Sequence, residues 1–491
     1  MSVKAIFPKV FQVYWVDVAA ELRDEHGWDI CYFVGKGSLK EKALKLFPEA
    51  VFHTKAAFLK NSIPDGCEAV APSHLDKELL SALSPYESIF MKMMDRYNYD
   101  GSLTYQKRVS HYHFMLRYWK GALEHFKPGV IVYSVSPHLG YDYVLYAVSR
   151  IMNIPTVMFE RTSLPGFVYP VTSFEDGSEI IRRSYIKALE TKEKKKISLT
   201  PETAAHIEKL SKDYESAMPF HLRYKLTHFK NKGDVGKTAL LLLRIAKDFI
   251  IAQVFKRGNL RFLRKNYYKS IGLLKKRKLL AHYRQLAHAV NLEIPYVFVA
   301  LQCEPERQTC PVGGVFGNQY LMIDLLSKVV PEGWKIYVKE HPSQFKAYQM
   351  VERAKTVESY DLIASTPKVK LVPLTYSSFN LIDHAQATAT VSGTVGWESV
   401  VRGKPTLLFG HSWYEDCKGI FVTHTVEDCK KAIQKIENGY RANMDEIKCF
   451  ARIVESCSVR GYIDRLYEKM NLIPPEENVE NLARAILEFT S

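Results

Sequence analysis

Strands and helices alternate regularly in the second half of this 491-residue chain, and this alternation limits the possible folds more than any other feature. Short apolar runs that suit strands recur there, and helical patterns separate them. The expected strands are 296–301, 334–338, 369–372, 387–391 and 406–409, and the expected helices are 319–329, 378–384 and 395–402. Strands that alternate with helices form parallel sheets covered by helices. The sequence therefore predicts an α/β domain over roughly residues 290–470.

The first half contains a similar strand–helix–strand unit. Residues 130–135 and 156–159 are expected strands around a helix at 139–152, and the apolar runs 6–15 and 29–34 are expected to be strands as well. A chain of this length is too long for one hydrophobic core. We predict an α/β domain at 1–182, a mostly helical basic segment at 183–290, a second α/β domain at 291–470, and a helix at 471–491 that returns to the first domain.

The positive charge of the chain is concentrated in one segment. Residues 223–284 hold eighteen Lys and Arg against two acids, so this segment carries +16, and the remainder of the +15 chain carries −1. We expect the segment to contact an anionic membrane surface. An acidic polysaccharide, nucleic acid and plain solvent are the alternatives. No nucleic-acid motif accompanies the charge, and we therefore expect no nucleic-acid partner.

The cysteines and the N-terminus predict the compartment. Eight scattered cysteines without CxxC spacing suit free thiols in a reducing environment. The first seventeen residues do not resemble a signal peptide. We expect a cytoplasmic protein that lies peripherally at the inner face of the cytoplasmic membrane.

The segment Ser392-Gly393-Thr394-Val395-Gly396-Trp397-Glu398 follows an expected strand and opens an expected helix. Small residues let the backbone approach an anion, and the amides at a helix start attract negative charge. The hydroxyls of Ser392 and Thr394 add donors. Glu398 lies about one turn into the helix, where it can accept hydrogen bonds from a ribose. We predict a nucleotide site that includes these three residues and Gly393; a capped helix without a ligand is the alternative.

Two more expected strands end in polar side chains. Lys339-Glu340-His341-Pro342-Ser343 follows one strand, and Gln302-Cys303-Glu304-Pro305-Glu306-Arg307 follows another. Ligands of open parallel sheets bind beyond the carboxyl ends of the strands. We expect Lys339 and His341 to contact phosphate oxygens, and Gln302, Glu304 and Glu306 to contact a sugar or base. Structural roles in solvated loops are the alternative.

The first half supplies candidates for the chemistry itself. His138 follows one expected strand, and Glu160 and Arg161 follow the next. If the two domains face each other, these side chains point at the nucleotide site. Glu160 is the candidate catalytic carboxylate, as base or nucleophile, and His138 is the rival base. Arg161 is the candidate that binds a charged group of the substrate. A structural Glu–Arg pair is the alternative.

Taken together, these stretches resemble the capsule polysaccharide biosynthesis family, which includes the retaining Kdo transferases of capsule assembly. The matching stretches are SVSPHLGYDYVLY (134–146), FERTSLPG (159–166), QCEPERQTCPVGGVFGNQ (302–319), YVKEHPSQF (337–345) and SGTVGWESVVRGKP (392–405). The His-Pro and Ser-Gly-Thr…Glu elements are also similar to those of glycerol-phosphate polymerases of teichoic acid synthesis.

The resemblance implies a GT-B fold, in which two Rossmann-like domains face each other, here with a helical basic insertion between them. It implies a glycosyltransferase whose nucleotide-sugar donor binds mainly to the second domain and whose acceptor is a glycan or glycolipid. Lys339, His341, Ser392, Thr394 and Glu398 fall on the nucleotide and phosphate motifs of the family. The resemblance implies no metal and no other cofactor, and the sequence has no Asp-x-Asp motif.

The resemblance favours a CMP-linked sugar acid such as Kdo as the donor, transferred to a bacterial surface polysaccharide or its lipid-linked precursor. Two alternatives stay open. One is a polyol-phosphate transferase that uses a CDP-linked donor, and the other is a non-catalytic scaffold that binds nucleotide or glycan in a capsule assembly complex.

Overall fold

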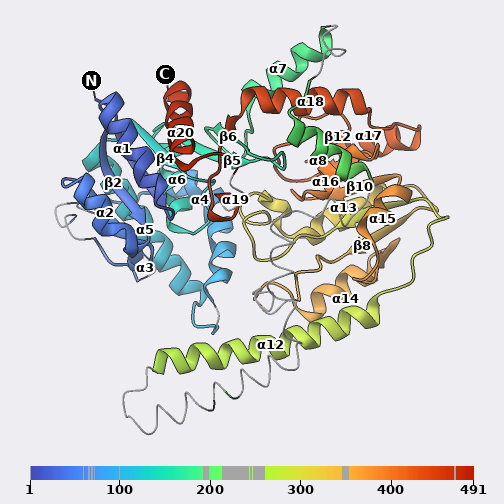
Figure 1. Ribbon diagram of the computed structural model, residues 1–491. Coiled ribbons are helices and arrows are strands. Elements are labelled where there is room, and N and C mark those ends of the chain that lie inside the picture. The colour runs from blue at the N-terminus through green and yellow to red at the C-terminus, as the bar shows by residue number, and fades with distance from the viewer. Residues whose placement is uncertain are drawn as a thin grey trace.

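A computed structural model describes most of the chain. The described residues are 2–490 except 59, 65–66, 68–69, 71, 99, 192–197, 213–242, 244–245, 247–259, 346–352 and 469–471. Within them the chain forms two sheet domains that lie side by side (Figure 1). Most of the basic segment predicted at 223–284 therefore lies outside the described residues. Its continuous described part begins at Leu260.

The first domain is built on a seven-stranded sheet with the order β13-β6-β5-β4-β1-β2-β3. Strands β1 to β5 are parallel, whereas β6 runs antiparallel to β5 and β13 antiparallel to β6. The strands are β1 (Lys4–Val10), β2 (Asp29–Gly35), β3 (Val51–Thr54), β4 (Val130–Tyr133), β5 (Thr156–Arg161), β6 (Phe167–Val171) and β13 (Val459–Arg460). Its helices are α1 (Tyr14–His26), α2 (Lys40–Leu46), α3 (Lys55–Phe58), α4 (Lys77–Met93), α5 (Tyr105–Phe126) and α6 (Tyr141–Ile151).

The second domain is built on a six-stranded parallel sheet with the order β12-β11-β10-β7-β8-β9. Its strands are β7 (Tyr296–Ala300), β8 (Lys335–Lys339), β9 (Val369–Leu371), β10 (Ala387–Thr390), β11 (Thr406–Leu408) and β12 (Ile420–Val422). Its helices are α13 (Gln319–Val329), α14 (Val357–Ser365), α15 (Ser378–His384), α16 (Val395–Val401), α17 (Val426–Glu437) and α18 (Met444–Cys457). The central strand β7 is fully apolar and buried from Tyr296 to Val299, as a strand covered by helices on both faces requires.

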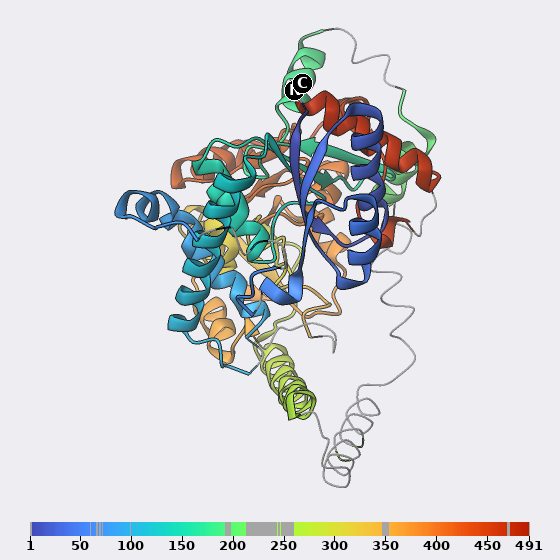
Figure 2. The same cartoon turned by 90° about the vertical axis from the view of Figure 1, so that its left-hand side faces the viewer.

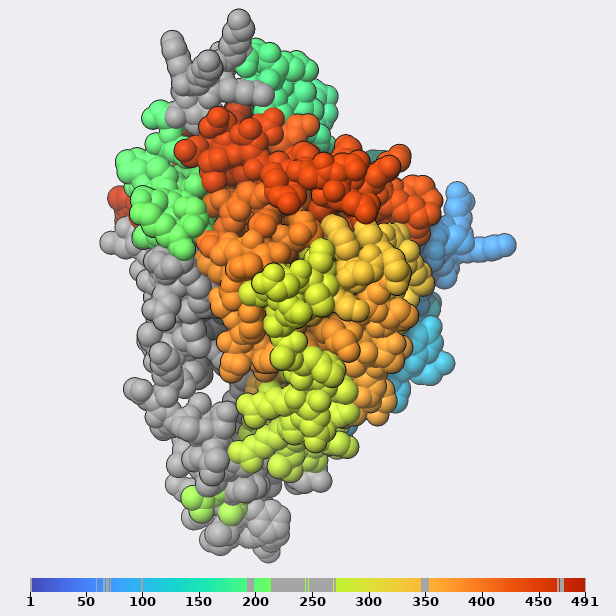
Figure 3. Space-filling view, turned by 90° about the vertical axis from the view of Figure 1, so that its right-hand side faces the viewer, coloured from blue at the N-terminus to red at the C-terminus, as the bar shows by residue number. Residues whose placement is uncertain are grey.

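Helices of the middle segment lie around the second domain. They are α7 (Glu179–Glu190), α8 (Pro201–Lys212) and α12 (Leu260–Leu286). Figure 3 shows α12 lying across one face of the second domain and continuing beyond it. The predicted α/β fold with two sheet domains is confirmed, and the first of the two sheets is mixed.

The last helix, α20 (Pro475–Thr490), packs beside α1 on the first domain (Figure 2). The chain returns to this domain earlier than the boundary predicted at 471, because β13 at Val459–Arg460 already pairs with β6 of the first sheet. A short helix, α19 (Arg465–Glu468), follows β13. The first domain is therefore completed by the C-terminal end of the chain.

The prediction of one strand over 6–15 is wrong in its second half. Strand β1 ends at Val10, and α1 begins at Tyr14. Tyr14 and Trp15 lie on the buried face of α1, so the apolar run belongs to two elements in succession.

None of the helices in the described ranges combines the length and apolar character needed to span a membrane.

Candidate active site between the two domains

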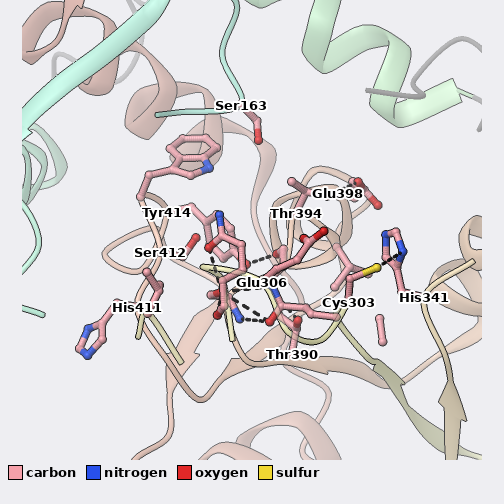
Figure 4. Close-up of a pocket in the computed structure, with 18 of the residues that line it drawn as sticks. Ser163, Cys303, Glu306, His341, Thr390, Thr394, Glu398, His411, Ser412 and Tyr414 are labelled. Atoms are coloured by element: carbon pink, nitrogen blue, oxygen red, sulfur yellow. Dashed lines mark hydrogen bonds between the residues drawn. The ribbon is translucent and has the colours of Figure 1, made fainter. Parts of the chain in front are cut away.

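A cavity of about 450 Å³ lies where the carboxyl edges of the two sheets meet. Its second-domain wall comes from the loops after β7, β8, β10 and β11. Its first-domain wall comes from residues 160–163 at the end of β5, with Tyr169 and Phe174. Ten of the predicted site residues line it: Glu160, Arg161, Gln302, Glu306, Lys339, His341, Ser392, Gly393, Thr394 and Glu398. Figure 4 shows Ser163 on the opposite side from Thr390 and Glu306.

Hydrogen bonds between Gln302 and Ser392 join two of the loops that line the cavity. The side-chain amide of Gln302 donates to Ser392 Oγ at 3.1 Å, and the backbone N–H of Ser392 donates to Gln302 Oε1 at 3.0 Å. Ser392 Oγ also donates to the carbonyl of Gln308 at 2.8 Å. The loops after β7 and β10 are therefore held in one arrangement before any ligand binds.

The Ser-Gly-Thr loop is packed tightly enough to require its glycines. A Cβ on Gly393 would lie 2.8 Å from Thr390 Oγ1, and a Cβ on Gly396 would lie 2.7 Å from two ring carbons of Tyr414. The Tyr414 hydroxyl donates to the carbonyl of Gly393. This packing brings the backbone at the start of α16 to the cavity wall, where the Gly396 amide donates to the Gly393 carbonyl at 3.1 Å and the Glu398 amide to the Thr394 carbonyl at 2.9 Å.

Glu398 lies one turn into α16 and faces the cavity. The Thr394 hydroxyl donates to Glu398 Oε1 at 2.9 Å. Burial raises the pKa of Glu398, and the Thr394 hydrogen bond opposes this rise. The second carboxylate oxygen is thus placed to accept hydrogen bonds from a ligand hydroxyl.

His341 has a defined tautomer. The backbone N–H of Ser343 donates to His341 Nδ1 at 3.1 Å, so Nδ1 holds a lone pair and the neutral ring carries its proton on Nε2. Cys303 Sγ lies 3.0 Å from the same Nδ1, as the dashed line in Figure 4 marks. His341 is consequently suited to donate one hydrogen bond from Nε2.

Lys339 is a largely buried cation whose ammonium group has two protein acceptors. Its Nζ donates to the carbonyl of Tyr376 at 2.6 Å and to Ser378 Oγ at 2.9 Å. Burial lowers the pKa of Lys339 to about 8. An ammonium has three donors, so one N–H remains for a ligand beyond these two partners.

The first domain contributes Glu160, which is paired across the domain boundary. Arg307 Nη1 donates to both carboxylate oxygens of Glu160 at 3.1 Å and to Ser136 Oγ at 2.7 Å. The exposed fractions of the Arg307 and Glu160 side chains are 11% and 14%, so the pair is largely shielded from water. Burial lowers the pKa of Arg307, while the charge of Glu160 raises it in part.

Two predicted site residues do not reach the cavity. Glu304 is buried and paired with Lys355 at 3.2 Å, and it accepts a hydrogen bond from Gln319 at 2.7 Å. Lys355 also lies 3.8 Å from the buried Glu340, which accepts from the His341 backbone at 2.8 Å. The prediction that Glu304 contacts the donor is therefore wrong, because its carboxylate joins the loops after β7 and β8 behind the cavity wall.

His138 is the second correction. His138 Nδ1 lies 2.8 Å from Lys9 Nζ and 2.9 Å from the Ser136 carbonyl, and Lys9 is itself paired with the buried Asp142 at 3.2 Å. Burial lowers the pKa of His138 well below its usual value, and the neighbouring cations Lys9, Arg96 and Arg307 lower it further. The side chain does not line the cavity. Its lowered pKa and its position outside the cavity make His138 unsuited to act as the catalytic base.

Arg161 lines the cavity but has a protein partner. Its Nη1 lies 2.8 Å from Asp464 Oδ2, and about one third of its side chain is exposed. Asp464 comes from the segment that returns to the first domain after β13. A substrate anion at this position therefore competes with Asp464.

Sequence reasoning missed one wall of the cavity. The lining residues His411, Ser412, Trp413, Tyr414 and Glu415 follow β11. Burial alone would lower the pKa of His411, but the hydrogen bond and charge of Glu415, 3.7 Å away, outweigh burial and raise it. The sequence did contain a signal for this wall, because residues 411–415 follow the expected strand 406–409 just as the other motifs follow their strands.

A double-mutant cycle tests whether Arg307 and Glu160 hold the domains together. Arg307→Met leaves a shielded carboxylate without its partner, so the free energy of unfolding should fall by about 3 kcal/mol. Arg307→Met with Glu160→Gln should lose at least about 1 kcal/mol less than the sum of the single changes. Urea unfolding measures all three variants.

The exposed pair Lys212–Glu208 in α8 is the matched control, with an expected coupling of about 0.3–0.5 kcal/mol. Equal coupling in both cycles would show that the interdomain pair is no stronger than a surface contact.

Comparison with solved structures gives matches of low identity. One is a structure of Thermosulfurimonas dismutans KpsC, a beta Kdo 2,4 transferase, with 18% identity, a TM-score of 0.23, and coverage of 37% of this chain and 55% of that one. This chain thus spans about half of that protein. The beta Kdo 2,7 transferase of the same KpsC matches with 11% identity, a TM-score of 0.29, and coverage of 74% and 88%. The UDP-GlcNAc 2-epimerase of Methanocaldococcus jannaschii matches with 13% identity, a TM-score of 0.25, and coverage of 92% and 99%.

No curated protein matches the chain. A family model does match it: the model described as capsule polysaccharide biosynthesis protein covers residues 244–454, somewhat less than half of the chain. These residues include the cavity-lining loops after β7, β8, β10 and β11. The resemblance to the capsule polysaccharide biosynthesis family, inferred from the motifs, is confirmed over this range.

Proposed function

We propose that this protein is a glycosyltransferase that moves a sugar from a nucleotide-activated donor to a bacterial surface polysaccharide or its lipid-linked precursor. The observation that carries this proposal is a cavity of about 450 Å³ formed by both domains, with a carboxylate from one and the Ser-Gly-Thr and His-Pro loops from the other. Its volume lies within the range of about 300–1,000 Å³ that small-ligand sites occupy.

The second domain holds the donor in this proposal. His341 Nε2, the remaining N–H of Lys339 and the backbone of the Ser-Gly-Thr loop bind the phosphate oxygens. The Thr394 hydroxyl orients Glu398. Glu398 accepts hydrogen bonds from the ribose. Gln302 and Ser392 act mainly on each other and keep the two loops in register, and Glu306 lies beside them in the cavity wall.

The first domain supplies the group that acts on the acceptor. Glu160, at the carboxyl end of β5, accepts the proton of the acceptor hydroxyl as its oxygen bonds to the anomeric carbon. The bond from that carbon to the donor phosphate breaks, and the nucleotide leaves with the electron pair. Arg307 orients the Glu160 carboxylate through hydrogen bonds to both of its oxygens.

A CMP-linked sugar acid such as Kdo is the donor in this proposal, because the motifs of the sequence resemble those of the Kdo transferases of capsule assembly. Its carboxylate would pair with Arg161, in place of or together with Asp464. A polyol-phosphate transferase with a CDP-linked donor, or a scaffold that binds donor without turnover, would use the same loops and differ in the products formed.

Nucleotide binding tests the donor site. The folded protein should gain about 2.7 kcal/mol of stability at a hundredfold excess of CMP over its dissociation constant, whereas UDP, GDP and ADP should give less. His341→Ala or Glu398→Ala should abolish the thermal shift without lowering the melting temperature of the free protein. CDP as the preferred ligand would instead support polyol-phosphate transfer. If both variants bind nucleotide as the wild type does, the donor lies elsewhere.

Turnover tests the role of Glu160. Glu160→Gln keeps the shape of the side chain and removes the base, so it should bind CMP as the wild type does while product formation falls by at least about a hundredfold. Mass spectrometry of the acceptor measures this product. An active Glu160→Gln enzyme would remove Glu160 from the mechanism, and a wild type that binds donor but never turns over would support the scaffold.

We further propose that the basic segment rests on an anionic membrane surface. The described part, α12, exposes Lys275, Arg277, Lys278 and Leu274, and it extends beyond the second domain (Figure 3). Each basic residue near such a surface contributes about 1 kcal/mol. Replacing these three cations with Ala should therefore weaken cosedimentation with phosphatidylglycerol vesicles by up to about 3 kcal/mol. Equal loss in the control Lys430→Ala/Lys431→Ala on α17 would contradict the proposal.

A further inference from the structure

Three adjacent strands of the first sheet end beside one another at the edge that faces the second domain. Phe11 directly follows β1, Lys36 directly follows β2, and Lys55 directly follows β3. Because parallel strands present their carboxyl ends at the same edge, these side chains share the surface where open α/β sheets bind ligands. None of the three lines the donor cavity.

The three side chains converge on one spot. Lys36 Nζ lies 5.9 Å and Lys55 Nζ lies 5.8 Å from the centre of the Phe11 ring, and Lys55 Nζ lies 5.7 Å from the Tyr97 ring. These distances are at the outer limit of cation–π contact, and such contacts are weaker than an ion pair with a carboxylate. Phe11 and Tyr97 are partly buried, so an aromatic surface lies between and beside two ammonium groups.

Within the described part of the chain, neither Lys36 nor Lys55 has an acidic partner. Other lysines of the same domain do: Lys4 pairs with Asp29 at 3.6 Å and Lys42 with Asp17 at 2.5 Å. Lys55 is only partly exposed, and burial lowers its pKa, with Asp142 opposing the shift and Arg96 adding to it. A half-buried cation without a counter-ion is costly, and a bound anion would offset that cost.

The charges around this spot leave an excess of positive potential. Asp142 is the acid that acts on Lys55, and it is already paired with Lys9 at 3.2 Å and accepts hydrogen bonds from the amides of His138 and Leu139. Arg96 adds a further cation, and its guanidinium donates to the carbonyls of His138 and Cys310. The carboxyl edge of this sheet therefore attracts negative charge.

The distance from Glu160 suits an extended substrate. Glu160 ends β5, and the sheet order from there is β5-β4-β1-β2-β3. Neighbouring strands lie about 4.8 Å apart, which puts the end of β1 about 10 Å and the end of β3 about 19 Å from the end of β5. An acceptor must therefore extend over several sugar units to contact both Glu160 and this spot.

We propose that Lys36 and Lys55 bind a carboxylate or phosphate group of the acceptor, while a sugar ring of the acceptor packs against Phe11. The proposal rests on the proposed function, since it takes the first domain as the side that binds the acceptor. It assigns the acceptor to the class of anionic glycans, held away from the site of transfer. The same anchor favours chains that already carry charged units over short neutral acceptors.

Calorimetric titration with defined oligosaccharides tests this anchor. The probes are tetragalacturonate, which carries carboxylates, a mannose oligosaccharide that carries a 6-phosphate, and neutral maltotetraose. The wild type should bind one or both anionic probes and bind maltotetraose at least tenfold more weakly. Lys36→Ala/Lys55→Ala should weaken anion binding at least tenfold, and Lys36→Arg/Lys55→Arg should retain it. Which anionic probe binds more tightly identifies the group.

Lys77→Ala, an exposed lysine on α4, is the control and should bind as the wild type does. The proposal is overturned if the wild type binds neither anionic probe, if the double alanine variant binds as the wild type does, or if Lys77→Ala loses as much. Nucleotide binding is measured on the same variants and should be unchanged. Failure of the wild type to bind any nucleotide would instead count against the donor site, whatever the anionic probes show.

Discussion

The guanidinium group of Arg307 crosses from the second domain into the first and ends between Glu160 and Ser136. Both ends of this contact lie at carboxyl edges of sheets, one after β7 and the other after β4 and β5. Removing one partner of a shielded ion pair lowers the free energy of unfolding more than removing one partner of an exposed pair. The reason is that the remaining charge is neither paired nor hydrated. This contact joins the two edges at the cavity, and further contacts between the domains, such as Arg96 with the Cys310 carbonyl, lie outside it.

The other loops of the site are held in place within the second domain by polar contacts between protein groups alone. Gln302 with Ser392 joins the loops after β7 and β10, and the buried group of Glu304, Lys355 and Glu340 joins the loops after β7 and β8. Burial raises the pKa of Glu340, and Lys355 counters this rise. Three loops therefore reach the cavity already ordered, so binding loses little conformational entropy in arranging them. The contact between Arg307 and Glu160 places the Glu160 carboxylate beside these loops.

Much of the second domain was predictable because its elements are short, apolar and separated by clear turns. Helices 319–329 and 378–384 were predicted at their observed bounds, and β7 to within one residue. The run at 6–15 failed because periodicity does not separate a strand from a helix in an unbroken apolar stretch. Strand β13 is two residues long and pairs with a strand nearly 300 positions away, which no local pattern signals.

The same limit applies to the site. The rule that ligands bind at strand ends correctly brought Ser392, Thr394, His341 and Glu160 to one cavity. It does not say which way a side chain turns, so Glu304 and Glu306, two positions apart, ended on opposite sides of the wall. Arg307 stood in the same motif, yet its partner comes from the other domain, and only the packing of the domains reveals it.

Hydrogen–deuterium exchange of the whole chain, with and without saturating nucleotide, tests most directly that one donor site is formed by both domains. A nucleotide in the cavity should slow exchange in residues 302–308, 339–343 and 392–398 of the second domain. It should also slow exchange in residues 160–163 of the first domain at the same nucleotide concentration. Protection that is absent from these segments, or confined to regions away from the cavity, would contradict a nucleotide site between the domains.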